Sequence, residues 1–389
     1  MFHIRSLRLW LCAAIVLSSV FIWGRAPKTV NAEGSLFTVI STDDGVDAAG
    51  CDATHCSLRE AIIAANAATE GAIIQFAIPN TDAGCTEGGV CTIALTSPLP
   101  DITQAGIVIN GYSQPGASVN TLADQDNAAL KIVVDGSALS ADMLTIKADG
   151  CTVRGLVIGG TSNSAISILG SSNTIEGNFI GADVEGNGVL PNGTGITIGD
   201  GSSATLFQGN TIGGDTPAER NVISGNLNAG IEIQAAATKI SGNFIGLADD
   251  GTNALANRLF GVRIIAGEGN IIGGPTSAER NVISGNGGDG ILLSSSSGRT
   301  IVRGNTIGMD AAGASALPNQ ANGIRSETNN TNTNIIGGTQ SGQGNLIAGN
   351  AGSGVMVVVP YGSNSNSNTI LRNAIYDNGG LASTWAATA

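Results

Sequence analysis

The chain has 389 residues, of which 57 are glycine, only 12% are charged and 4% are aromatic. It is poor in the Lys and Glu that long helices favour and rich in the turn and strand formers Gly, Asn, Ser, Thr and Ile, so the composition argues for an all-β fold with many corners. The net charge is −13 and no block of Lys or Arg occurs, which argues against nucleic acid or an anionic membrane as a partner.

Residues 1–32 have the pattern of a secretory signal peptide. Arg5 and Arg8 precede an apolar run at 9–23, and Val30-Asn31-Ala32 offers the small residues that a signal peptidase reads. The run of about 15 residues is shorter than the ~20 needed to span a membrane, which favours cleavage after Ala32 over an uncleaved anchor. Cleavage would remove four basic and no acidic residues and leave a net charge of −17. We therefore expect a secreted or cell-surface protein whose mature chain has no membrane span.

Five cysteines follow this segment, in two close pairs and one single residue. In an exported chain such pairs are typical of disulfides that close small loops, and the residues concerned are Cys51, Cys56, Cys85 and Cys91. A zinc site is the alternative, but these spacings differ from a zinc knuckle and His55 is the only histidine nearby. We expect Cys151 to be a buried thiol in a strand.

Residues 33–105 form a distinct N-terminal region that contains one predicted helix. Ser57, followed by Glu60 three residues later, is a capping box that marks a helix start. Four apolar residues then fall on one helical face: Leu58, Ala61, Ile62 and Ala65. A short amphipathic helix at this place would cover the open end of a β-solenoid, which we favour over a catalytic role for Arg59 or Glu60.

The segment 106–380 repeats itself. Residues 220–226 return letter for letter at 280–286, and Gly-Asn-Phe-Ile-Gly occurs at both 177–181 and 242–246. Successive apolar strand anchors lie 22 to 35 residues apart. The shortest step fits one coil of a parallel β-helix, with three short strands and three corners, and the longer steps are the same coil with an inserted loop.

Two kinds of insert alternate along these coils. The first kind occupies 181–192, 246–257 and 308–319, and the second kind occupies 213–220, 273–280 and 337–344. Stacked coils would pair in parallel at ~4.8 Å, with Ile and Val pointing inward in columns. The Gly-Asn corners predict a left-handed backbone at the asparagines, and parallel crossovers predict right-handed winding. The expected fold is thus an all-β, right-handed parallel β-helix (a solenoid) with a short N-terminal capping α-helix, ending in a tail at 381–389 that is either an imperfect cap or truncated.

The string Cys-Ser-Leu-Arg-Glu-Ala at 56–61 resembles the signature of CSLREA-domain proteins, which are exported bacterial proteins in which this segment precedes β-helix repeats. The units Asn-x-Ile-x-Gly-Asn and Arg-Asn-Val-Ile-Ser-Gly-Asn are similar to the repeats of that group and of the wider pectin-lyase-like superfamily. The resemblance covers residues 35–380. It implies a secreted or surface right-handed β-helix, and it implies no single activity.

The superfamily resemblance raises an enzyme as an alternative. Polygalacturonan hydrolases of this fold carry Asn-Thr-Asp, Asp-Asp, Gly-His-Gly and Arg-Ile-Lys; the last two are absent here, and Asn-Thr-Asp occurs only at 80–82, ahead of the coils. Asp249 and Asp250 form the one Asp-Asp pair among the coils and are the candidate catalytic residues. Their apparent counterparts in the other inserts are Asp183 and Asp310. A position reused in every second coil favours a loop feature over an active site.

Lyases of this fold hold calcium with carboxylates, and Ca²⁺ takes six to eight oxygen ligands. The candidate calcium ligands are Asp183, Asp249, Asp250 and Asp310. Stacking would separate them by roughly 9–10 Å, too far for one shared ion, so only single ions within a loop would fit and no other cofactor is expected. Candidate bases on or beside strands are Arg263, Arg303 and Arg325. The repeated pairs Glu219-Arg220 and Glu279-Arg280 suggest ion pairs or hydrogen bonds to the next coil.

The sequence therefore favours a scaffold that binds carbohydrate or a surface protein through a polar face of stacked loops, without an evident catalytic site. The alternative is a polysaccharide lyase or glycoside hydrolase that acts in a groove between the two insert columns. Three or more carboxylates and a base converging in that groove would favour the enzyme.

Overall fold

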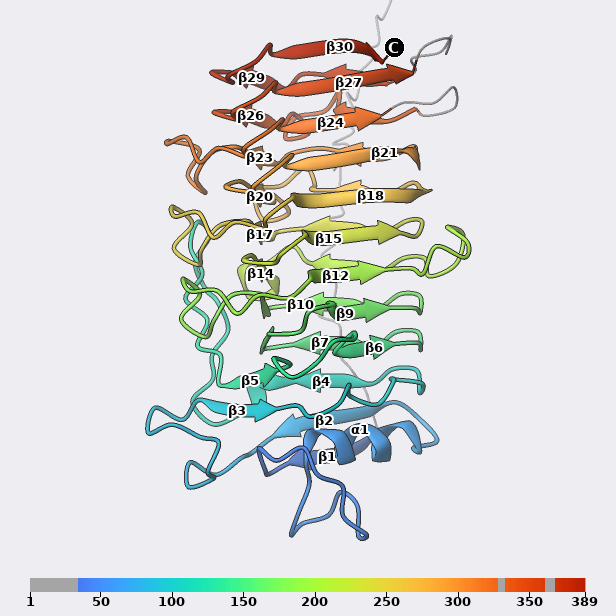
Figure 1. The fold of residues 1–389 in the computed structure, drawn as a ribbon, viewed down its shortest axis with the longest axis vertical. Helices are drawn as coiled ribbons and strands as arrows, with labels where there is room; N and C mark the ends of the chain where they lie inside the picture. Colours follow the sequence, from blue (N-terminus) through green and yellow to red (C-terminus); the bar gives the residue numbers. More distant parts are fainter. Residues whose placement is uncertain (1–33, 328–332, 361–367, 389) are drawn as a thin grey trace, which may run out of the picture. The chain divides into compact units, whose positions relative to one another are not determined.

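The computed structural model describes residues 34–327, 333–360 and 368–388, which wind into a right-handed parallel β-helix (Figure 1). The predicted signal peptide lies outside the described residues. Most coils contribute one strand to each of three sheets, and all strand pairs in these sheets are parallel. The predicted fold class, with three strands and three corners per coil, is confirmed. No helix among the described residues is long and apolar enough to cross a membrane.

Sheet A has eleven strands and starts nearest the N-terminal end. Its strands are β1 (Ser35–Val39), β2 (Ala72–Phe76), β4 (Val108–Asn110), β7 (Thr152–Arg154), β10 (Thr174–Glu176), β13 (Thr211–Gly213), β16 (Lys239–Ser241), β19 (Ile271–Ile272), β22 (Ile301–Val302), β25 (Ile335–Gly337) and β28 (Thr369–Leu371).

Sheet B has ten strands. They are β3 (Cys91–Ala94), β5 (Ile132–Asp135), β8 (Leu156–Gly159), β11 (Phe179–Ile180), β14 (Val222–Ile223), β17 (Phe244–Ile245), β20 (Val282–Ile283), β23 (Thr306–Ile307), β26 (Leu346–Ala348) and β29 (Ala374–Tyr376).

Sheet C has nine strands. They are β6 (Leu144–Ile146), β9 (Ser164–Ile168), β12 (Thr194–Ile198), β15 (Ala229–Gln234), β18 (Phe260–Glu268), β21 (Ile291–Gly298), β24 (Ile324–Glu327), β27 (Val355–Pro360) and β30 (Ser383–Thr388). Two short 3₁₀ turns, η1 (Gly111–Ser113) and η2 (Pro217–Glu219), lie in connections. Strands β1 to β3 and β30 fall outside the segment 106–380, so the sheets extend beyond the predicted repeats at both ends.

Aliphatic side chains fill the interior in continuous columns, as the repeat predicts. In sheet C one column is in register from coil to coil and almost fully buried: Leu144, Ile166, Ile196, Ile231, Val262, Ile291, Ile324 and Val355. Because each coil covers the apolar side chains of its neighbours, no coil can bury its own core alone.

The corner asparagines differ from the prediction. The left-handed backbone lies at the preceding glycines, such as Gly225 with φ of 78°, and not at the asparagines. The asparagine side chains instead form two buried ladders, in which each Nδ2 donates to the Oδ1 of the next coil over 2.8–3.1 Å. Asn178, Asn221, Asn243, Asn281, Asn305, Asn345 and Asn373 make the first ladder, and Asn192, Asn226, Asn257, Asn286, Asn319, Asn350 and Asn378 make the second. These amides satisfy carbonyls of the interior corners; before Asn373 and Asn378 the left-handed residue is Arg372 or Asp377 and not a glycine.

Helix α1 (Leu58–Asn66) covers the N-terminal end of this core, as predicted. Ser57 caps it with the predicted capping box, accepting from the Glu60 amide while Glu60 accepts from the Ser57 amide. Leu58 lines the same interior space as Ile109 of β4, Val134 of β5 and Leu144 of β6, one strand from each sheet. The helix therefore seals the apolar interior below the first complete coil (Figure 1).

Sheet B is apolar on its outer face as well. Val157, Phe179, Val222, Phe244 and Val282 project outward from successive strands into a second buried cluster. The inserts of the first kind cover this face with Ala182, Leu247, Leu255 and Ala311. The flank of sheet B is thus the place where insert loops and sheet meet.

Candidate functional site: a groove over sheet B

Two adjoining hollows form a groove between the two insert columns over sheet B. The first, of about 100 Å³, is lined by residues of both inserts together with Phe244 of β17 and Val282 of β20. The second, of about 280 Å³, lies between the later inserts, beside Thr306 of β23 and Leu346 of β26. Ser277 and Arg280 line both hollows, so the two lie side by side.

A loop from the N-terminal half of the chain occupies the lower part of this groove. We call residues 118–129 the strap; an antiparallel bridge between Ser118 and Ala129 closes it, and it runs along the flank beside the inserts in Figure 1. Asn120 donates to the carbonyl of Pro217 over 3.1 Å, and the amide of Asp126 donates to the carbonyl of Asp249 over 2.7 Å. The strap is therefore attached to both insert columns.

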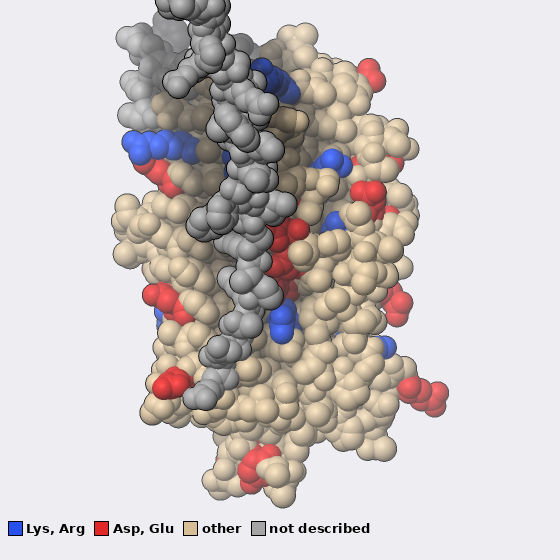
Figure 2. Space-filling model, turned by 180° about the vertical axis from the view of Figure 1, so that it is seen from behind, with Lys and Arg blue, Asp and Glu red and all other residues tan. Residues whose placement is uncertain are grey.

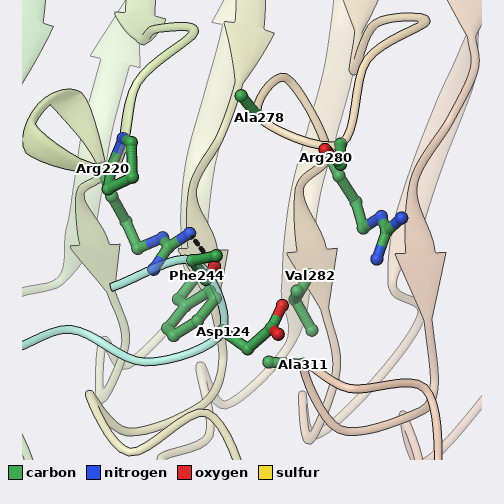
Figure 3. Close-up of a pocket in the computed structure, with 10 residues that line it drawn as sticks. Asp124, Arg220, Phe244, Ala278, Arg280, Val282 and Ala311 are labelled. Atoms are coloured by element: carbon green, nitrogen blue, oxygen red, sulfur yellow. Dashed lines mark hydrogen bonds between the residues drawn. The ribbon is translucent and has the colours of Figure 1, made fainter. Parts of the chain in front are cut away.

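Arg220 binds the backbone of the strap. Its guanidinium donates to the carbonyls of Ala123 at 2.5 Å, Gln125 at 2.6 Å and Leu122 at 3.1 Å. It also donates to Gly242 in the next coil and stacks 4.2 Å from the ring centroid of Phe244 (Figure 3). Burial lowers the pKa of Arg220, but the guanidinium stays charged. The buried charge is thus satisfied by peptide carbonyl oxygens of the strap.

Arg280 occupies the same position in the following repeat and meets a different environment. No hydrogen bond or ion pair of its guanidinium occurs within the described residues, and its side chain is only partly buried. It extends away from Arg220, toward the later coils (Figure 3). Around it lie small or polar residues, among them Thr276, Ser277 and Thr306. In one repeat the arginine donates its hydrogen bonds to carbonyls of the chain itself. In the next repeat the equivalent arginine faces a polar hollow.

Two carboxyl groups, one in the strap and one in the insert that it contacts, have raised pKa values. Burial raises the pKa of Asp126 to about 6, and its Oδ2 is buried without a hydrogen-bond partner. Burial, followed by repulsion from Asp250, Asp183 and Glu185, raises the pKa of Asp249 to about 6. Arg220 partly offsets the shift of Asp126. Both carboxyl groups therefore change charge near pH 6, and the backbones of their two residues are joined by a hydrogen bond.

We predict that the strap docks more firmly at pH 5 than at pH 7.5. The docked Asp126 has a pKa of about 6 and a released one an ordinary value near 3.8, so the docked state binds the extra proton between these values and gains stability as the pH falls. Because pH 5 lies about one unit below the docked pKa, the expected gain between pH 7.5 and pH 5 is roughly 1.4 kcal/mol. Hydrogen exchange of amides 118–129, corrected for intrinsic rates, measures this. Asp126→Asn is expected to flatten most of the pH dependence, with Asp249 supplying the rest; an unchanged profile would contradict the assignment.

The structure corrects the repeat position given to Asp249 and Asp250. The bridges Ala182–Val189, Leu247–Ala254 and Met309–Ala316 align the three inserts of the first kind. In that alignment Asp183 and Asp310 match Ala248, whereas Asp249 matches Val184 and Ala311. Asp249 is therefore not a reused loop position, and the argument that assigned it to loop structure by repetition is wrong.

The other predicted aspartates act in the turns of their inserts. Asp183 accepts from the amide of Gly188, Asp250 accepts from those of Thr252 and Asn253, and Asp310 accepts from those of Ala314 and Ser315. Among the described residues, Asp183, Asp249, Asp250 and Asp310 do not supply three oxygens within 4.8 Å of one another. Calcium binding by these residues stays a prediction.

The predicted bases and the Glu-Arg pairs have other partners. Arg263 pairs with Glu232 at 3.2 Å and Arg325 with Glu327 at 2.7 Å on the outer face of sheet C. Glu219 and Glu279 do not pair with the adjacent arginines; they accept from Thr216 and Thr276 at the start of their inserts. Arg220 does bond to the next coil, as expected. Figure 2 shows that charged side chains are scattered over the face opposite to that of Figure 1, as far as the grey atoms leave it visible.

The cysteines and the capping segment lie apart from the groove. The disulfides Cys51–Cys56 and Cys85–Cys91 are present, and Cys151 is a buried free thiol whose pKa burial raises. Arg59 binds the carboxylate of Asp44 at 2.7 Å and the carbonyls of Ser97 and Pro98, which supports its structural interpretation.

The strap, Asp126 and the contrast between Arg220 and Arg280 were not predicted from the sequence. One sequence difference could have indicated the contrast between the two arginines. In the coil after Arg220 the equivalent strand position is Phe244, whereas in the coil after Arg280 it is Thr306. The strap gave no such signal, because it lies 91 or more residues before Arg220.

Neither a protein-family model nor a curated protein sequence matches the chain, so CSLREA membership stays a prediction. Among solved structures, the chain is similar to the enzymatically active domain of tailspike protein 2 of bacteriophage CBA120, with 9% identity and a TM-score of 0.42 over 81% of this chain and 43% of that one. It is also similar to the A-module of mannuronan C-5 epimerase AlgE6 of Azotobacter vinelandii (12%, TM-score 0.28, 91% and 89% covered) and to an alginate lyase, AlyF-OU02 (12%, 0.23, 90% and 84%). The chain spans less than half of the tailspike domain, and likenesses of this size carry no argument about activity.

Proposed function

We propose that the chain is an exported β-helix scaffold that binds an extended polysaccharide in the groove over sheet B, without altering it. The observation that carries this is the half-buried guanidinium of Arg280, which has no partner within the described residues and faces a hollow of about 280 Å³. Arg220, its counterpart, donates to three carbonyl oxygens of the strap. The same position one repeat later is suited to oxygen atoms of a bound chain.

The lining of the hollow favours a saccharide over an apolar ligand. Glycine, serine, threonine and asparagine make up most of it, and Leu346 is its largest aliphatic side chain. Such a surface offers hydroxyl and backbone groups for hydrogen bonds but little apolar area to bury. Arg280 would bind either a pair of hydroxyl oxygens or the carboxylate of a uronate residue.

The groove also has the shape that a polymer needs. It continues from one coil to the next along the flank, so that successive sugar units would meet successive loops. The strap ends it on one side, which gives a bound chain a defined limit near Ala311. Export through the predicted signal and the two disulfides support a place outside the cell.

The test is a binding panel of neutral and uronate-containing polysaccharides, followed by affinity electrophoresis or calorimetry with purified protein. We expect binding by at least one polymer, and a loss of affinity of about tenfold or more for Arg280→Gln. Ala312→Trp, which would fill the hollow from its wall, should abolish binding. The matched control is Arg258→Gln, an exposed arginine that does not line the groove. No binding by any polymer, or equal losses in Arg280→Gln and Arg258→Gln, would overturn the proposal.

One observation favours a second function, cleavage of the bound polysaccharide. Asp249 has a pKa of about 6, the range of a general acid, and its carbonyl accepts from the amide of Asp126 in the strap that ends the groove. Three further carboxylates act electrostatically on Asp249. Arg220 cannot serve as the base of a lyase reaction, because its guanidinium is hydrogen-bonded to the strap. Release of reducing ends or unsaturated uronates that Asp249→Asn abolishes would establish this second function in place of simple binding.

A further inference from the structure

A histidine and three carboxylates gather beside the N-terminus of α1, outside the groove. His55 lies between two of them, with Nε2 at 2.8 Å from Oδ2 of Asp43 and Nδ1 at 2.9 Å from Oε2 of Glu60. Asp47 Oδ2 lies 3.5 Å from the same Nδ1. Carboxylate oxygens thus face both ring nitrogens.

The Nδ1 atom of His55 is buried and makes no hydrogen bond. The Glu60 oxygen is near enough, but it is out of line for an N–H donor at Nδ1. Because Nε2 is bonded to Asp43, the neutral ring carries its proton there and presents a lone pair at Nδ1. A lone pair that faces two anionic oxygens is repulsive unless a cation lies between them.

The spacing of the three atoms suits one metal ion. Bonds of about 2.0–2.1 Å to nitrogen and oxygen place neighbouring ligand atoms about 2.9–3.4 Å apart in octahedral or tetrahedral geometry. The measured separations from Nδ1 are 2.9 Å to Glu60 and 3.5 Å to Asp47, and all three atoms lie within 4.8 Å of one another.

The surroundings already orient these ligands. Glu60 is almost fully buried, with Oε1 accepting from the amide of Asp47 at 2.7 Å and Oε2 accepting from that of Ser57 at 3.0 Å. Asp47 uses Oδ1 for the amides of Ala49 and Gly50, and its Oδ2 makes no hydrogen bond within the described residues. Asp43 on Nε2 gives the carboxylate–histidine arrangement that fixes the ring of a metal-bound histidine.

We propose that Asp47, His55 and Glu60 bind one divalent transition-metal ion of the zinc class. One imidazole and two carboxylates match such an ion, whereas calcium takes six to eight oxygens and has no use for Nδ1. Asp47 and His55 come from the loop that precedes the helix, and Glu60 comes from its first turn, so the ion would fasten that loop to the cap of the core. The disulfide Cys51–Cys56 keeps both nearby thiols from the metal. A water completes the coordination on the exposed side of Asp47.

The test uses the whole chain, freed of metal with EDTA and titrated with zinc chloride by calorimetry at pH 7.5. We expect one ion per chain with micromolar or tighter affinity, and a rise in Tm of about 5 °C in excess zinc. Asp47→Asn and His55→Gln are each expected to lower the affinity at least about tenfold. Asp47→Asn keeps Oδ1 for its two loop amides, so it decides the matter if His55→Gln fails to fold.

Two controls make the outcome specific. Cys151→Ser removes the free thiol, and Asp101→Asn removes a carboxylate from the N-terminal region; both should bind zinc like the parent. The absence of zinc binding would overturn the proposal and leave His55 as a protonated bridge between carboxylates. Zinc binding that survives both Asp47→Asn and His55→Gln would also overturn it, as would calcium binding that equals zinc binding and survives His55→Gln.

Discussion

Replacing Asn243 with leucine is expected to destabilise the β-helix by about 4 kcal/mol, because it interrupts an amide ladder in the interior. Asn243 is fully buried; its Nδ2 donates to the carbonyls of Ile212 and Ser241 and to Oδ1 of Asn281, and its Oδ1 accepts from Nδ2 of Asn221. Leucine has a similar size but would leave a donor on Asn221 and a carbonyl on Ile212 without partners. Urea unfolding followed by circular dichroism measures the loss.

The matched control is Asn187→Leu, which makes the same change at an exposed asparagine of a first-kind insert. We expect it to stay within about 0.5 kcal/mol of the parent. Because a solenoid can open locally, hydrogen exchange at β14 and β20 should show faster exchange beside the broken ladder in Asn243→Leu. A loss below about 1 kcal/mol would mean that the ladder adds little to the stability of the coils.

Arg220→Ala is expected to release the strap, while Arg280→Ala leaves it docked. The first change removes three hydrogen bonds to strap carbonyls and the contact with Phe244, which we estimate at about 3 kcal/mol. Amides 118–129 should then exchange about 100-fold faster. Arg280→Ala removes the equivalent side chain of the next repeat, which has no partner within the described residues, and should leave this exchange unchanged.

Arg220→Lys refines the comparison, because lysine keeps the charge but lacks the planar fork of donors. We expect an intermediate rate of exchange. If Arg220→Ala changes the exchange of the strap by less than about threefold, the strap is held by its contacts with Pro217 and Asp249 instead. A released strap would also lengthen the open groove, so polysaccharide binding by Arg220→Ala reports whether the strap limits the bound chain.

The capping helix and the strands of the coils could be predicted because their signals are local. Ser57 and Glu60 stand three residues apart, and the alternating strand of each coil, such as Ile231-Glu232-Ile233, indicates which side chains point inward. The two disulfides are also short-range features, with sequence separations of 5 and 6. Each of these elements is determined by residues within one coil, so the repeat shows it without knowledge of the whole.

The candidate sites depend on contacts that the repeat does not state. The strap reaches Arg220 from 95 to 98 residues away, and nothing in the segment 118–129 marks it as a partner. The inserts were aligned by their aspartates, whereas the bridges in the structure shift Asp249 by one position. The asparagines were assigned to turns, because a corner sequence does not show which of its two residues turns and which reaches the next coil.

The sequence alone predicts a parallel β-helix with a helical cap, since aliphatic residues that recur once per coil can be buried only by stacking. The right-handed winding is expected from the general rule for parallel crossovers and not from the repeat. The tertiary structure alone shows that Arg220 is hydrogen-bonded to the strap, that the Arg280 guanidinium has no partner within the described residues, and that His55 lies between Asp43, Asp47 and Glu60. The physical reason is that a repeat encodes contacts between equal positions of neighbouring coils, whereas these sites are made where a non-repeating loop meets the coils.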